Sequence, residues 1–98
     1  MNNHAGSQTV LGYCLDAASS AAMSNSSAYR LDFGNDFNPG CILQQSLTFY
    51  SQLLAGDDAV IETWQGHENN LYFNIRNGDK VKCKAEFIIN PQLIRKSN

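Results

Sequence analysis

The chain has 98 residues, of which 43% are hydrophobic and 16% are charged. The charged share lies below the roughly 25% of typical soluble domains, and the apolar share argues against a disordered chain. Seven basic and nine acidic residues leave a net charge of −2, which argues against a nucleic-acid-binding module with its basic stripe. A single domain of this size buries only about 60–65% of its surface. We therefore expect its spare apolar surface to be used in association.

The first 29 residues hold a single charged side chain, Asp16, within a helical pattern. We predict a helix over residues 7–24, with Ser7 as the N-cap and Gly6 just outside. The apolar and small residues that recur at three- and four-residue spacing are Leu11, Cys14, Leu15, Ala18, Ala21 and Ala22. The intervening positions are also mostly apolar or small, so the pattern predicts a central helix buried on every side.

Turn-forming residues and a change of period follow the helix. A short extended piece is expected at residues 28–33 and a loop at residues 34–40. Within residues 41–89 the period becomes two, which predicts four antiparallel strands, followed by a frayed tail over residues 90–98. The turns between the strands are expected at residues 56–58, 66–69 and 77–79.

The predicted strands alternate between an apolar and a polar side. On the first strand, the apolar residues on one side are Leu43, Leu47, Phe49 and Leu53. On the last strand, the residues expected to face the core are Val81, Cys83, Ala85, Phe87 and Ile89. The Asn77-Gly78 pair predicts a tight hairpin, and Trp64 and Tyr72 are expected to form a cross-strand aromatic pair. The predicted class is α+β, with a meander of strands wrapped around the helix.

The three cysteines, Cys14, Cys41 and Cys83, are widely spaced and match no disulfide framework or metal-ligand spacing. We expect them to be reduced and buried in a cytoplasmic protein. The N-terminus lacks the basic segment of a signal peptide. The apolar stretch at residues 10–23 is too short to span a bilayer about 30 Å thick, so no membrane partner is expected.

Several segments resemble the hotdog superfamily, in particular its acyl-CoA thioesterases. Residues 2–7, Asn-Asn-His-Ala-Gly-Ser, resemble the loop before the central helix of those enzymes, and residues 15–19, Leu-Asp-Ala-Ala-Ser, resemble a stretch within that helix. Residues 47–61 resemble the strand–Gly-Asp–strand step, and residues 71–87 resemble the closing hairpin. The resemblance implies one hotdog domain over residues 1–98, with four to five antiparallel strands around the helix.

The hotdog resemblance also defines the limits of the domain. Residues 1–6 would form the loop before the helix, and residues 90–98 would form the tail. Hotdog domains usually have a strand before that loop, whereas Met1 falls almost on it. We therefore expect a domain that is short at its N-terminus and depends on dimerisation.

Asp16 is the candidate catalytic residue, because a carboxylate enclosed in an apolar helix needs a compensating partner. The resemblance implies that it faces a cleft at a dimer interface and activates water, or attacks directly, against a thioester. The alternative is a solvated or interface carboxylate without chemistry.

The start of the helix is the candidate oxyanion site. Backbone N–H groups at Gly6, Ser7 and Gln8 lack intrahelical partners and could hold a thioester carbonyl. The resemblance adds Asn3 and His4, which would orient the carbonyl or the attacking water. Without the resemblance, this segment is an ordinary helix start with a frayed terminus.

The sequence gives little support for metal, phosphate-binding or serine-hydrolase chemistry. Neither His4 nor His67 belongs to a metal-ligand spacing, and the sequence contains no phosphate-binding loop or serine-hydrolase elbow, so no metal and no cofactor are expected. Four basic residues are expected on the outer face of the last hairpin: Arg76, Lys80, Lys82 and Lys84. They either meet the phosphates of CoA or an acidic carrier protein, or form a solvated, edge-protecting face.

Two functions remain from the sequence. The first is hydrolysis of an acyl-CoA or acyl carrier protein thioester, with Asp16 activating water, in a homodimer or homotetramer. The alternative is a non-catalytic hotdog module for acyl binding or dimerisation. A dehydratase of the same fold is less consistent with the sequence, because no paired histidine and acid are found.

Overall fold

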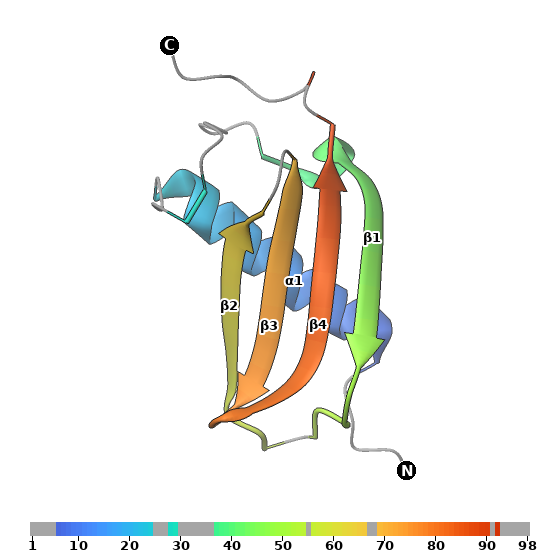
Figure 1. The fold of residues 1–98 in the computed structure, drawn as a ribbon, viewed down its shortest axis with the longest axis vertical. Helices are drawn as coiled ribbons and strands as arrows, with labels where there is room; N and C mark the ends of the chain where they lie inside the picture. The colour runs from blue at the N-terminus through green and yellow to red at the C-terminus, as the bar shows by residue number, and fades with distance from the viewer. Residues whose placement is uncertain are drawn as a thin grey trace.

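A computed structural model describes residues 6–24, 28–29, 37–54, 56–66, 69–90 and 92 of the chain. In chain order, the elements are α1 (Ser7–Met23), a 3-10 turn (Pro39–Cys41), β1 (Ile42–Phe49), β2 (Ala59–Gln65), β3 (Asn70–Asn77) and β4 (Lys80–Ile89). The helix forms one layer and the antiparallel sheet forms the other (Figure 1). The α+β class, the predicted helix and the four predicted strands are confirmed.

The helix α1 buries one stripe rather than its whole surface. The buried residues, Val10, Cys14, Ala18 and Ala22, recur every four residues and face the sheet. Asp16 stands about half a turn away from this stripe and is exposed. The prediction of a helix enclosed on every side is therefore wrong for the single chain, because a two-layer fold covers only one helix face.

The start of α1 also differs from the prediction by one residue. Gly6 is the N-cap, with extended φ and ψ of −76° and 168°, and no side chain caps the helix. Ser7 is the first helical residue instead of the N-cap. At the other end, the helix closes at Ser24, whose hydroxyl donates to the Ala21 carbonyl at 3.3 Å.

The strand order is β1-β4-β3-β2, so the predicted simple meander is wrong for β1. The strands β2, β3 and β4 do form a meander, but β1 pairs with β4 at the opposite edge from β2. Residues 50–58 connect β1 to β2 along one end of the sheet (Figure 1). Nine residues can reach about 30 Å, whereas crossing three strand spacings needs only about 14 Å.

The core lies between α1 and the central strands. Phe73 on β3 and Phe87 on β4 are its largest members, with ring centroids 4.6 Å apart. The other fully covered residues of these two strands are Leu71, Ile75, Cys83 and Ile89, and Ala85 is 5% exposed. All three cysteines are buried, as predicted.

A β-bulge changes which residues of β1 face the core. The ladder pairs Ile42 with Ile89 and Gln44 with Ile88, so Leu43 has no partner on β4. Leu43 is 65% exposed, which corrects the prediction that it lies on the apolar side. The strand also ends at Phe49, whereas the predicted strand continues to Leu53.

A second bulge and the β3–β4 turn shift the predicted hairpin. Because Ile75 pairs with Cys83 and Arg76 with Val81, Lys82 is the extra residue. Val81 is only half-buried, in contrast to its predicted inward position. The closing pair is Asn77 with Lys80, so the turn residues are Gly78 and Asp79 rather than Asn77 and Gly78. Gly78 has a positive φ of 62°, a backbone conformation that glycine adopts without steric cost.

Candidate functional site

The candidate catalytic residue Asp16 lies on the outer face of α1, away from the sheet. The exposed residues of this face, besides Asp16, are Gln8, Thr9, Gly12, Tyr13, Ser20 and Met23. Asp16 is the only charged member, although a solvent-facing helix surface is ordinarily rich in charge. The structure thus replaces the predicted buried carboxylate with an exposed one in an unusually uncharged surface.

The candidate oxyanion site is open to solvent. Gly6, Ser7 and Gln8 are all exposed, and a Cβ placed on Gly6 would meet no atom within 4 Å. The helix rises 1.5 Å per residue, so Asp16 stands about 12–15 Å along the axis from these N–H groups. In one chain the two parts of the predicted site are therefore too far apart to act on the same carbonyl.

The other predicted members of the site are not placed. Asn3 and His4, like His67, lie outside the described residues. Their assignment to substrate binding stays a prediction.

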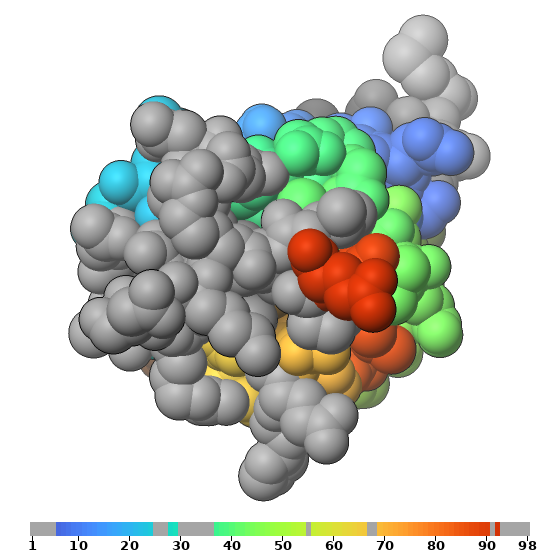
Figure 2. Space-filling view, turned by 90° about the horizontal axis from the view of Figure 1, so that it is seen from above, coloured from blue at the N-terminus to red at the C-terminus, as the bar shows by residue number. Residues whose placement is uncertain are grey.

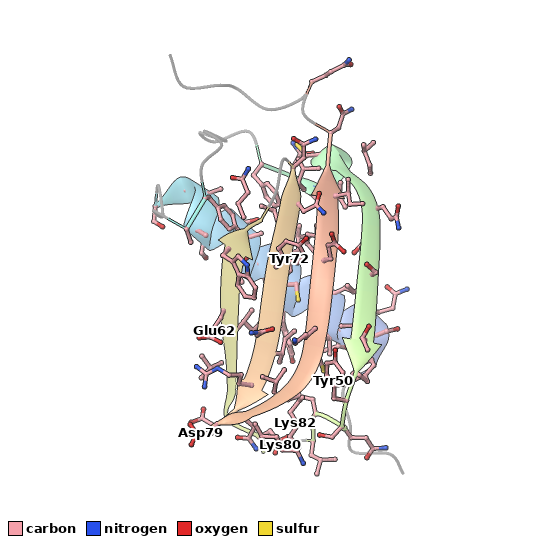
Figure 3. All side chains as sticks on the ribbon, viewed as in Figure 1. Tyr50, Glu62, Tyr72, Asp79, Lys80 and Lys82 are labelled. Carbon is pink, nitrogen blue, oxygen red and sulfur yellow. The ribbon has the colours of Figure 1, made fainter. Side chains whose placement is uncertain are left out.

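The basic residues of the β3–β4 hairpin do not form one cationic patch. Arg76 Nε donates to Glu62 Oε1 at 2.8 Å, and Lys82 Nζ lies 3.8 Å from Asp57 Oδ2. Lys84 Nζ lies 5.9 Å from the centroid of the Tyr50 ring. Figure 3 shows Lys80 and Lys82 at the turn end of the sheet, with Glu62 on β2. Because two of the four cations face acids, the surface offers little free charge to a phosphate.

The edge strand β1 is not among the sites that the sequence predicts. No charged residue stands between Asp36 and Asp57 in the sequence, and six of the eight residues of β1 are exposed. Large apolar side chains are exposed on β1 and just after it: Leu43 65%, Phe49 43%, Tyr50 61% and Leu54 46%. Proteins usually protect an open edge with charges or proline. The long uncharged run was the signal for this surface.

The predicted aromatic pair is confirmed on the sheet face opposite α1. The ring centroids of Trp64 and Tyr72 are 5.8 Å apart and the ring planes differ by 28°. Asn70 Nδ2 donates to Glu86 Oε2 at 2.5 Å and lies 3.4 Å from the Tyr72 hydroxyl. The alternation of polar residues on β3 indicated a polar face, but it did not indicate which neighbours these residues would meet.

The buried thiols are poor nucleophiles. Burial raises the pKa of Cys14 to about 12, and the neighbouring Cys83 thiol acts in the same direction. Burial also raises the pKa of Cys83, although the nearby Lys82 opposes the change. A thiol protonated at neutral pH does not attack a thioester. Neither residue therefore replaces Asp16 as a catalytic candidate.

The described part of the chain contains no group of three or more side chains suited to holding a metal ion, and no helix long and apolar enough to cross a membrane. No protein-family model matches this chain, and no similar curated protein or solved structure was found. The functional assignment therefore depends on the geometry and on the sequence resemblance.

Proposed function

We propose that this protein is a hotdog-like module that functions as a homodimer and binds an acyl thioester. The observation that carries the proposal is the uncharged, exposed edge of β1. An edge strand with apolar side chains and no charge is a template for another strand. A second copy of the chain is the occupant that presents the same uncharged edge.

The hydrogen-bond pattern identifies the groups that β1 offers at this edge. The Tyr50 N–H donates to the Lys82 carbonyl at 2.8 Å, which fixes the alternation along the β1–β4 ladder. Gln45, Leu47 and Phe49 consequently direct their backbone N–H and C=O groups away from β4. Among the described residues, no strand pairs with this side of β1.

These three residues define a self-complementary register. If two copies of β1 pair antiparallel around Leu47, Leu47 faces its own equivalent and Gln45 faces Phe49 of the other copy. The outward backbone N–H and C=O groups of all three residues are then hydrogen-bonded to the other copy, and no like charges face each other. The two sheets would join into one, and the two α1 helices would lie on the same side of it. This follows because the two-fold axis that relates two antiparallel strands is perpendicular to the sheet. The N-terminal part of α1 lies beside β1 (Figure 2), so this part of each helix would lie near the seam.

Sedimentation velocity tests the dimer. We expect the wild type to sediment at twice the 10.8 kDa mass of the chain, and Phe49→Lys to sediment as a monomer. Val60→Lys is the matched control, because Val60 is 46% exposed but lies on β2. A wild type that stays monomeric at every concentration, or a Val60→Lys variant that dissociates equally, would contradict the interface. A mass of four chains would indicate a homotetramer built on the same dimer.

The uncharged outer face of α1 supports an acyl thioester as the ligand. In the proposed dimer, two such faces lie on one side of a joined sheet, where they would line an apolar path for an acyl chain. The sequence resemblance to acyl-CoA thioesterases points to the same ligand. Thermal unfolding with octanoyl-CoA and palmitoyl-CoA should show a higher midpoint than with CoA alone. Equal midpoints for all three would contradict acyl binding.

Hydrolysis is the second candidate, favoured by the position of Asp16 as the only charge on that face. Asp16 of one copy would act with the helix start of the other, since one chain separates them by about 12–15 Å. We expect thiol release from acyl-CoA by the wild type and a loss of at least about 100-fold in Asp16→Asn. Binding without any thiol release would select the non-catalytic module.

A further inference from the structure

The sheet face turned away from α1 is polar and aromatic, and its charges balance. Its charged side chains are two acids and two bases: Glu62, Glu86, Arg76 and Lys84. Around them, amides and hydroxyls alternate with aromatic rings. Its side chains include Ser46 on β1, but none of Gln45, Leu47 and Phe49, which define the proposed dimer register, and none of the outer face of α1.

We propose that this face binds a neutral oligosaccharide, with one sugar ring stacked on Trp64 and the next sugars beside Tyr72 and Glu86. The planes of the Trp64 and Tyr72 rings differ by 28°, and Trp64 is 39% exposed. The flat side of a pyranose carries C–H groups, which are attracted to the electron-rich face of an aromatic ring. The exposed ring of Trp64, backed by Tyr72, is therefore a platform for such a ring.

The Tyr72 ring is packed between its neighbours without any ligand. A Cβ placed on Gly66 would stand 2.0 Å from Cε2 of Tyr72, so the Tyr72 ring lies directly against the Gly66 backbone. Trp64 lies against the same ring. Figure 3 shows Tyr72 over β3 on the sheet face turned toward the viewer, with α1 behind. A preorganised surface loses little side-chain entropy on binding.

Hydrogen-bonding groups for sugar hydroxyls lie next to the rings. Glu86 pairs directly with Tyr72 across β3 and β4, and Ser46 pairs with Glu86 across β4 and β1. Asn70 connects the Glu86 carboxylate to the Tyr72 hydroxyl. Carboxylate and amide oxygens accept from hydroxyl donors, and the amide N–H and serine hydroxyl donate to them.

The dimensions fit a short chain of sugars. One row across the sheet runs from Trp64 through Tyr72 and Glu86 to Ser46. Three strand spacings make this row about 14 Å long, roughly the length of three sugar rings.

The balanced charge of this face argues against single-stranded nucleic acids, which also stack on aromatic rings. Single-stranded nucleic acids need a cationic groove beside the aromatic platform. Here Arg76 is paired with Glu62, and Glu86 lies between the aromatic pair and the β1 edge. An uncharged, hydroxyl-rich ligand is not repelled by the charged side chains of this surface.

Trp64 is the single tryptophan of the chain, so its fluorescence reports on this face alone. The full-length protein would be titrated with maltotriose, cellotriose and triacetylchitotriose at millimolar concentrations. We expect at least one of them to change the emission, and Glu86→Gln to weaken its binding about tenfold. Glu62→Gln is the matched control, with an expected change below about twofold. Isothermal titration of Trp64→Ala should show the binding lost, with its circular dichroism spectrum unchanged.

Three results would overturn the proposal: no response to any trisaccharide, unchanged affinity in Trp64→Ala, or tighter binding of a single-stranded oligonucleotide than of any sugar. Phe49→Lys separates this site from the proposed dimer, because the substitution lies on the opposite face of the sheet. The oligosaccharide should bind this variant as it binds the wild type. Loss of sugar binding in Phe49→Lys would mean that the site depends on the dimer, contrary to the proposal.

Discussion

Asp57 joins three segments of the chain at the turn end of the sheet. Its Oδ2 accepts from the Leu54 N–H at 2.8 Å and lies 3.8 Å from Lys82 Nζ, while its Oδ1 accepts from Asn77 Nδ2 at 3.1 Å. Lys82 also donates to the Gln52 carbonyl at 3.1 Å. The bulge that makes Lys82 an extra residue on β4 thus places its side chain against the β1–β2 connection.

We expect Asp57→Asn to lower the free energy of unfolding by about 1–3 kcal/mol, because the amide turns a donor toward groups that themselves donate. Urea denaturation would measure the change. Asp58→Asn is the control, since Asp58 is exposed and its change should stay within about 0.5 kcal/mol. Equal effects of the two substitutions would show that Asp57 does not stabilise the connection.

The buried thiol of Cys14 makes stability sensitive to alkaline pH. Its pKa rises from 9.0 to about 12 on burial, so the folded state holds the proton more tightly than the unfolded state. This contribution is complete below pH 9 and is lost as the pH rises toward 12, at up to about 1.4 kcal/mol per pH unit. Tyr29 adds a loss in the same direction, because burial raises its pKa from 10.0 to about 12 despite its hydrogen bond with Thr63.

Urea denaturation between pH 7.5 and 10.5 tests this dependence. We expect a constant unfolding free energy up to about pH 8.5 and a decline above pH 9. Cys14→Ala should decline less steeply than the wild type. Parallel curves for the two proteins would show that Cys14 does not cause the loss.

At the scale of elements, two glycines have opposite surroundings. A Cβ on Gly12 would meet nothing within 4 Å, whereas a Cβ on Gly66 would collide with the Tyr72 ring. We expect Gly12→Ala to stabilise α1 by about 1 kcal/mol, because alanine is the better helix former. Gly66→Ala should destabilise the protein and change the emission of Trp64. Thermal unfolding of both variants measures the difference, and a stabilised Gly66→Ala variant would contradict the packing of Tyr72.

The sequence predicts the elements well because period and turn chemistry act locally. The helix and the inward residues of β3 follow directly from the spacing of Cys14, Ala18, Leu71 and Phe73. The neighbour of β1 does not follow, because alternation determines which face a residue takes but not which strand it pairs with. The two bulges cannot be predicted from the sequence either, since each depends on the fit of one strand against its partner.

The candidate site was less predictable than the fold. The sequence identifies Asp16 as the only acid in the helix, but its exposure depends on how much of α1 one sheet can cover. The distance from Asp16 to Gly6 follows from helix geometry alone and separates the two halves of the predicted site. The β1 edge emerges only when the strand order places β1 at the rim.

At the scale of the whole molecule, a two-layer domain leaves both the outer face of α1 and the edge of β1 uncovered. Both surfaces are poor in charge, and the proposed dimer would cover the edge of β1. Mass action then makes stability depend on concentration. The proposed hydrolysis requires the dimer, because a single chain does not bring Asp16 and the helix start together.

The most direct measurement is disulfide trapping of Leu47→Cys under glutathione disulfide. The proposed register places this position opposite its own equivalent, at a Cα separation of about 5.5 Å that a disulfide can bridge. We expect a covalent species of twice the chain mass, reversed by reduction, and no such species for Val60→Cys. The native cysteines are buried and should not contribute. Failure of Leu47→Cys to cross-link, or equal cross-linking by Val60→Cys, would contradict a homodimer built on β1.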